Sequence, residues 1–109
     1  MGLENIGVEL KSGGAIQVDE FSQTTVANIY AIGDVTDRMA LTPVAIHEAM
    51  CFVDTVYKDT PRSPNYDFVP TAVFSQPPIG TVGLDEDAAK QHCGKVDVYT
   101  SRFRPMKHT

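Results

Sequence analysis

The stretch Asn28-Ile29-Tyr30-Ala31-Ile32-Gly33-Asp34-Val35 decides the fold class of this chain. The nearly continuous apolar run at 29–32 predicts a strand covered on both faces, as in the parallel sheets of α/β proteins. The strand stops at Gly33, and Asp34 places one carboxylate at its carboxyl end, where open α/β sheets bind ligands. Further on, Thr42-Pro43 predicts a helix start, because an N-cap hydroxyl precedes proline at the first helical position. A carboxylate close to a helix N-terminus suits a cofactor that carries hydroxyl and phosphate groups.

Composition excludes several classes of function. The chain has 109 residues, of which 42% are hydrophobic and 21% charged, as in an ordinary globular protein. With a formal net charge of −5 and no basic cluster, we expect neither a nucleic-acid partner nor a membrane partner. No apolar run is long enough to cross a bilayer. Because no secretion signal is evident, we expect Cys51 and Cys93 to be thiols and the protein to be cytoplasmic.

The pattern along the first half predicts a short hairpin and one long helix. Residues 8–10 and 15–18 alternate apolar and polar side chains around Ser12-Gly13-Gly14, which indicates a hairpin or a bent pair of extended segments. The helix from Thr42 should end near Tyr57. Its expected apolar face is formed by Val44, Ile46, Ala49, Met50, Phe52, Val53, Val56 and Tyr57. The side chains expected to face solvent are His47, Glu48, Asp54, Thr55 and Lys58.

The second half follows a linker at 60–65, where the prolines Pro61 and Pro64 alternate with polar residues. We therefore expect two domains, residues 1–59 and residues 60–109. Strands are predicted at 71–74, 79–84 and 96–100, and Gln76-Pro77-Pro78 separates the first two. Asp85 is a candidate N-cap for a short helix over 86–91.

Each candidate site also has a purely structural explanation. Asp34 could be a turn or cap aspartate, and the helix start at Thr42, taken alone, is more often an ordinary capped helix than a ligand site. His47 and Cys51 lie four residues apart and share a helix face. No further ligand is evident near them, so we predict a buried thiol and a surface imidazole, with no metal site.

Together these segments resemble the flavin-dependent pyridine nucleotide–disulfide oxidoreductases. Residues 31–35 are similar to the second flavin-binding motif of that family, and residues 41–46 follow at the family's spacing. Residues 73–84 resemble the opening of the interface domain, and residues 101–106 resemble the segment that reaches the disulfide substrate. The resemblance implies an α/β fold class. Residues 1–59 would end a three-layer FAD/NAD(P)-binding domain, and residues 60–109 would begin an α+β interface, or dimerisation, domain.

The resemblance also implies which residues contact ligands. In Gly33-Asp34 the carboxylate would hydrogen-bond the ribityl or pyrophosphate part of FAD. The backbone at Leu41-Thr42 would meet the pyrimidine edge of the flavin, and Ala72 would lie close to the nicotinamide of NADPH. Phe103 and Met106 would lie toward the disulfide substrate, a weaker assignment because that contact varies within the family.

Two branches of the family fit the run Leu41-Thr42-Pro43, those that reduce glutathione disulfide and trypanothione disulfide. Lipoamide dehydrogenases usually carry Ala-His at the second and third of these positions. The implied homodimer passes a hydride from NADPH to FAD, and a protein dithiol then reduces glutathione disulfide.

Several catalytic parts of the family do not occur in this sequence. They are the Gly-x-Gly-x-x-Gly fingerprint, the redox cysteine pair, the NADPH domain and the late His-Glu pair, and Cys51 and Cys93 cannot replace the redox pair. We therefore expect an internal fragment of an enzyme, without a catalytic residue and inactive alone. The alternative is a non-catalytic remnant that acts as an interaction module.

Overall fold

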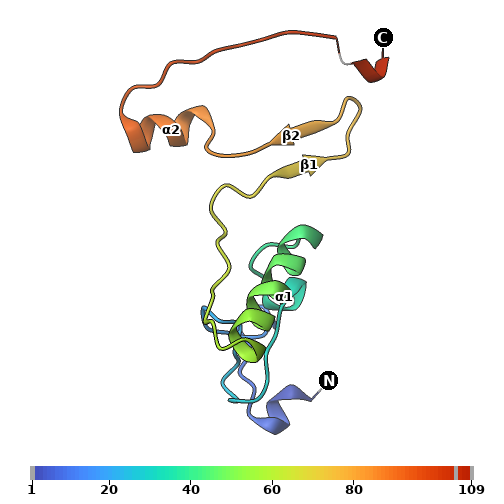
Figure 1. Ribbon diagram of the computed structural model, residues 1–109, viewed down its shortest axis with the longest axis vertical. Coiled ribbons are helices and arrows are strands. Elements are labelled where there is room, and N and C mark those ends of the chain that lie inside the picture. The colour runs from blue at the N-terminus through green and yellow to red at the C-terminus, as the bar shows by residue number, and fades with distance from the viewer. Residues whose placement is uncertain (1, 105, 109) are drawn as a thin grey trace. The chain divides into compact units, whose positions relative to one another are not determined.

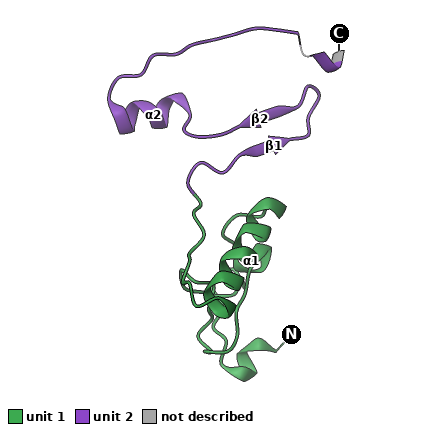
Figure 2. Cartoon of the chain, in the orientation of Figure 1, with its two compact units in different colours: residues 1–66 green, residues 67–109 purple. Residues whose placement is uncertain are grey.

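The computed structural model describes residues 2–104 and 106–108 (Figure 1). The chain divides into two compact units, residues 1–66 and residues 67–109 (Figure 2). Its elements in chain order are η1 (Leu3–Ile6), η2 (Gly33–Thr36), α1 (Thr42–Tyr57), β1 (Thr71–Val73), β2 (Ile79–Thr81), α2 (Glu86–Cys93) and η3 (Met106–His108). No helix in the described ranges has both the length and the apolar character needed to cross a membrane.

After η1, the first unit continues with a bent pair of extended segments, as predicted. Leu10 and Ile16 form an isolated antiparallel bridge. The turn between them closes where the Lys11 N–H donates to the Ala15 carbonyl at 2.8 Å. A small core lies beneath this turn, built from the buried side chains of Val8, Ile16 and Ala31.

The strand predicted at 29–32 is wrong, because no ladder forms there in the described part of the chain. Tyr30 pairs with Gln23 in an isolated bridge, and the backbone stays extended to Ile32, at φ −133° and ψ 161°. Ala31 is buried as expected. A strand covered on both faces needs continuous neighbours, and the described residues provide pairing at a single position.

Helix α1 spans Thr42–Tyr57 and ends at the predicted residue. The predicted N-cap at Thr42 is wrong by one position, since Leu41 is the N-cap and no side chain caps the helix. The Leu41 carbonyl accepts from the N–H groups of Val44, at 3.0 Å, and Ala45, at 3.1 Å. The first turn therefore closes on Leu41, and Thr42 and Pro43 become the first two helical residues.

The predicted division of α1 into an apolar buried face and a polar exposed face is wrong in its main part. The buried residues of the helix are Val44, Glu48 and Cys51, whose spacing defines one face. Ile46 and Met50 are instead 57% and 59% exposed. They line an open apolar pocket of about 400 Å³ on the outside of the helix. Within the first unit, α1 packs against η2, which decides which face is buried.

The second unit contains an antiparallel pair of strands and a short helix. Strands β1 and β2 pair in the register Thr71 with Thr81, Ala72 with Gly80 and Val73 with Ile79. β2 stops at Thr81, before the predicted end at residue 84, and Gly83 adopts a left-handed conformation with φ +84°. That conformation is incompatible with a continuing strand.

Helix α2 confirms the predicted cap. The Asp85 carboxylate accepts a hydrogen bond from the Ala88 N–H at 2.8 Å, and the helix runs two residues beyond the predicted end to Cys93. The strand predicted at 96–100 is wrong, since those residues form no ladder among the described ranges. Val98 and Tyr99 are exposed there. Alternation alone does not make a strand without a partner edge.

Candidate functional site

The candidate site is the loop at Gly33, where η2 meets the first turns of α1. Gly33 adopts φ +73°, and a Cβ added to it would lie 3.3 Å from the Cβ of Ala45. The position therefore favours glycine for two independent reasons, its left-handed backbone conformation and its close approach to the helix. Through this approach, η2, which contains Gly33 and Asp34, packs against α1, which begins at Thr42.

Asp34 is exposed in the first turn of η2. Within residues 2–104 and 106–108, no hydrogen bond or ion pair reaches its carboxylate. The turn is closed by the backbone instead, because the Asp37 N–H donates to the Asp34 carbonyl at 3.0 Å. The cap interpretation of Asp34 thus lacks support, and the carboxylate is available to accept hydrogen bonds from hydroxyl groups of a ligand.

The start of α1 offers a single backbone donor. Pro43 has no N–H, and the N–H groups of Val44 and Ala45 both donate to the Leu41 carbonyl. The Thr42 N–H has no partner in the described ranges, and no side chain caps the helix. The N-terminal end of the helix dipole therefore remains available to a ligand that carries negative charge.

Glu48 is part of this site, although the polarity pattern assigned it to solvent. It is 1% exposed. Its Oε2 accepts from the Gly33 N–H at 2.5 Å, and its Oε1 accepts from the Tyr66 hydroxyl at 2.6 Å. The spacing of the sequence could have indicated this position. Glu48 lies four residues after Val44 and three before Cys51, so all three share one helix face.

Arg38 and Tyr66 form a second layer behind Glu48. The Arg38 guanidinium donates to the Tyr66 oxygen and to the Asp19 carbonyl, the latter at 2.8 Å. Burial raises the pKa of the Tyr66 phenol, the bond to Glu48 raises it further, and Arg38 opposes both effects. Tyr66 therefore stays protonated at neutral pH and donates to Glu48.

Both cysteines are free thiols. Cys51 is buried, as predicted, with its Sγ 3.8 Å from Nε2 of His47, whereas Cys93 is exposed. The predicted surface imidazole at His47 is half-buried instead. In the part of the chain that the structure describes, no three His, Cys, Asp or Glu side chains gather as metal ligands.

The remaining predicted residues belong to the second unit. Ala72 is exposed on β1 opposite Gly80. It contributes to an open pocket of about 360 Å³ lined also by Pro70, Thr71, Gly80, Thr81 and Val82. Phe103 and Met106 are 79% and 92% exposed. These three residues thus lie in a different unit from Gly33-Asp34 and Leu41-Thr42.

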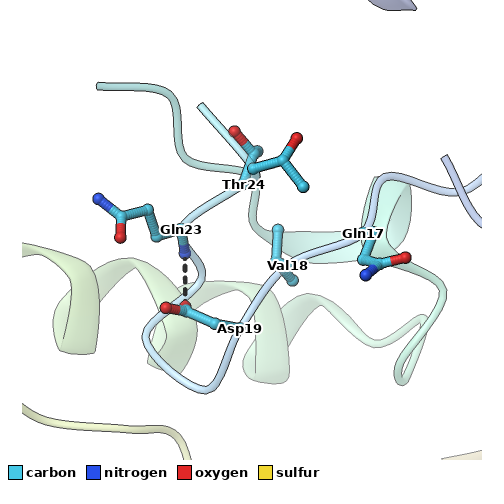
Figure 3. A pocket seen from close by; sticks show the side chains of 6 residues that line it. Gln17, Val18, Asp19, Gln23 and Thr24 are labelled. Carbon is cyan, nitrogen blue, oxygen red and sulfur yellow. Dashed lines mark hydrogen bonds between the residues drawn. The ribbon is translucent and has the colours of Figure 1, made fainter. Parts of the chain in front are cut away.

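A separate pocket of about 190 Å³ lies in the first unit (Figure 3). It is lined by Gln17, Val18, Asp19, Gln23, Thr24 and Thr25. The Asp19 carboxylate accepts from the N–H groups of Phe21 and Gln23, both at 2.9 Å, and so holds its own turn. Because its one carboxylate has this structural role and none of the predicted residues lines it, we assign the pocket no function.

Two domain families match the chain. Residues 1–49 match the pyridine nucleotide-disulphide oxidoreductase family, and residues 69–109 match the dimerisation domain of pyridine nucleotide-disulphide oxidoreductases. The chain therefore belongs to the pyridine nucleotide-disulphide oxidoreductases. The predicted family and the predicted α/β fold class are both confirmed.

Individual relatives narrow the comparison. The chain is 51% identical over its whole length to a chloroplastic/mitochondrial glutathione reductase of Pisum sativum, of which it covers 20%. It is 56% identical, over 97% of its length, to a trypanothione reductase of Trypanosoma congolense, of which it covers 22%. A glutathione reductase of Burkholderia cepacia is 50% identical over 98% of this chain, which covers 24% of that protein.

A solved structure supports the same assignment. An HOCl-induced flavoprotein disulfide reductase from Escherichia coli aligns with a TM-score of 0.79 and 33% identity, over 84% of this chain and 21% of that chain. The chain thus spans between a fifth and a quarter of the length of the relatives named here.

Proposed function

We propose that the chain is part of an NADPH-dependent flavoprotein that reduces glutathione disulfide. The observation that carries the proposal is the Gly33-Asp34 loop, which lies against the uncapped start of α1. This arrangement pairs an exposed carboxylate with a backbone donor and a helix dipole. Glutathione reductases that are 45% to 51% identical across nearly the whole chain support the same conclusion.

FAD fits the groups that the loop presents. The Asp34 carboxylate can accept hydrogen bonds from the ribityl or ribose hydroxyls, and the Thr42 N–H can donate to an acceptor at the edge of the flavin ring. The helix N-terminus favours negative charge at that edge by about 0.3–1 kcal/mol when exposed, and by up to about 2 when partly buried. Bound FAD would supply the redox chemistry, and these residues would bind and orient it.

The second unit would contribute to dimer formation and to the binding of the two substrates. We propose residues 1–59 as the end of the FAD-binding domain and residues 60–109 as the start of the dimerisation domain of a homodimer. The exposed position of Ala72 allows contact with the nicotinamide of NADPH. Phe103 and Met106 would lie toward glutathione disulfide, and their exposure is compatible with that role. The two free thiols support a reducing, cytoplasmic location.

Trypanothione disulfide is the second candidate substrate, because the trypanothione reductase of Trypanosoma congolense is 56% identical to the chain. Measured kcat/KM for both disulfides separates the two candidates. A preference for trypanothione disulfide would replace the proposed substrate and leave the proposed cofactor in place.

The test begins with the gene on both sides of these codons. We expect a Cys-x-x-x-x-Cys motif upstream and a His-Glu pair downstream. The protein from the complete reading frame should purify with FAD and oxidise NADPH only when a disulfide is present. A reading frame confined to these residues, or an intact protein that binds no flavin, would refute the proposal and favour the non-catalytic interaction module.

A further inference from the structure

Glu48 connects the helix to the loop that presents Asp34. Its carboxylate is buried, and its two oxygens accept from two separate segments, the Gly33 N–H and the Tyr66 hydroxyl. A buried carboxylate is costly unless hydrogen bonds compensate for the lost water. Both oxygens are compensated here, and one of the donors is the N–H of Gly33, the residue immediately before Asp34.

The Gly33 bond restricts the direction of the loop. Gly33 has φ +73°, a conformation in which glycine has wide freedom. A hydrogen bond from its N–H to an ionised acceptor is short and strong, and it removes much of that freedom. The following residue then has one preferred orientation, with its side chain exposed.

Tyr66 determines which carboxylate oxygen of Glu48 accepts from Gly33. The Tyr66 hydroxyl occupies Oε1, so Oε2 remains for Gly33. The Arg38 guanidinium donates one hydrogen bond to the Tyr66 oxygen and another to the Asp19 carbonyl. The carboxylate is thus fixed from two sides, as a group that orients a binding loop must be.

We propose that Glu48 is a positioning residue for the flavin, which holds the Gly33 peptide so that Asp34 presents its carboxylate to FAD. The inference rests on the proposed function, in which Asp34 contacts the cofactor. Glu48 itself does not touch FAD in this account. Its effect on FAD affinity therefore depends on the Asp34 side chain being present.

The test is a double-mutant cycle in the intact gene product. FAD is removed and titrated back, and the dissociation constant is measured by flavin fluorescence for wild type, Glu48→Gln, Asp34→Asn and the double variant. Glutamine offers one carbonyl oxygen where two donors require acceptors, so one bond is lost. Tyr66→Phe removes the Oε1 partner and the acceptor of the Arg38 guanidinium, and it leaves the bond from Gly33 to Oε2 in place. Glu86→Gln, in an exposed ion pair on α2, is the matched control.

We expect Glu48→Gln to weaken FAD binding roughly tenfold, the effect of losing one hydrogen bond to a charged group. Tyr66→Phe should weaken it less, because the bond to Gly33 remains, and Glu86→Gln should leave it unchanged. In the Asp34→Asn background, Glu48→Gln should have little further effect. This coupling distinguishes positioning from general stabilisation.

Three results would overturn the inference. One is an effect of Glu48→Gln on FAD affinity that is undiminished in the Asp34→Asn background. Another is a lowered unfolding temperature of the flavin-free protein with unchanged FAD affinity. If Glu48→Gln does not fold, the cycle is repeated with Tyr66→Phe and Asp34→Asn. The third overturning result is that the effects of these two substitutions on FAD affinity are fully additive. A wild-type protein that binds no FAD would refute the proposed function itself, and this inference with it.

Discussion

Replacing Gly33 with alanine tests the close approach of η2 to α1 most directly. Alanine at φ +73° adopts a left-handed conformation, which costs roughly 1–2 kcal/mol for a residue with a Cβ. The added Cβ would also lie 3.3 Å from the Cβ of Ala45, closer than ordinary van der Waals contact. Ala45 lies in the first turns of α1. Its Cβ is fixed by the helix backbone, so no side-chain rotation can relieve the contact. Overpacking of this kind adds about 1–3 kcal/mol.

Gly14→Ala is the matched control for the conformational part of this cost. Gly14 has φ +84°, but a Cβ there would meet nothing within 4 Å. We therefore expect about 1–2 kcal/mol of destabilisation for Gly14→Ala and about 2–5 kcal/mol for Gly33→Ala. Adding Ala45→Gly to Gly33→Ala should relieve the contact, at a cost of about 1 kcal/mol in helix propensity.

Hydrogen exchange of the intact, flavin-free gene product measures these differences locally. Peptides that cover 33–57 report the opening of η2 and α1, and peptides that cover 10–18 report the turn at Gly14. Equal destabilisation by the two alanine substitutions would refute the argument from close approach. So would a failure of Ala45→Gly to reduce the effect of Gly33→Ala.

Two further predictions concern local electrostatics. Asp85→Ala removes the cap bond to the Ala88 N–H and should destabilise α2 by about 0.5–2 kcal/mol, seen as faster exchange of peptides covering 86–93; unchanged exchange would contradict the role of the cap. Hydrogen bonds from Lys58 and then Arg62 lower the pKa of Asp54 below its ordinary value of 3.8. Its stabilising effect is therefore complete above that value and is lost as the pH falls through the lowered pKa. Urea unfolding of wild type and Asp54→Asn should differ at pH 7 and converge at low pH, and a difference that grows on acidification would contradict this sign.

The elements that the sequence predicted well are those with local causes. α1 ends at Tyr57 as expected, and Asp85 caps α2 through its own side chain. Proline near a helix start and an aspartate before an acidic first turn act within a few residues. The turn between residues 10 and 16 is also local. Such signals are read directly from adjacent residues, and they placed these elements to within one or two positions.

The strands at 29–32 and 96–100 failed for a non-local reason. Both have the composition of a strand, but a ladder is a property of two chain segments and not of one. Tyr30 finds a single partner, and residues 96–100 find none among the described ranges. Apolar runs therefore predicted burial at Ala31 correctly and regular pairing incorrectly.

Glu48 shows why the candidate site could be predicted only in part. Gly33 and Asp34 are visible in the sequence because a glycine and a carboxylate interrupt an apolar run. Glu48 gives no such signal, because its partner is a backbone N–H fifteen residues earlier in the chain, and every residue except proline carries that group. Polarity assigned it to solvent, yet the close approach at Gly33 brings a peptide N–H within reach of the buried face of α1. Gly33 thus marks the ligand loop in the sequence. In the folded chain its N–H also requires an acceptor on the buried face of α1, and the polarity pattern does not predict that acceptor.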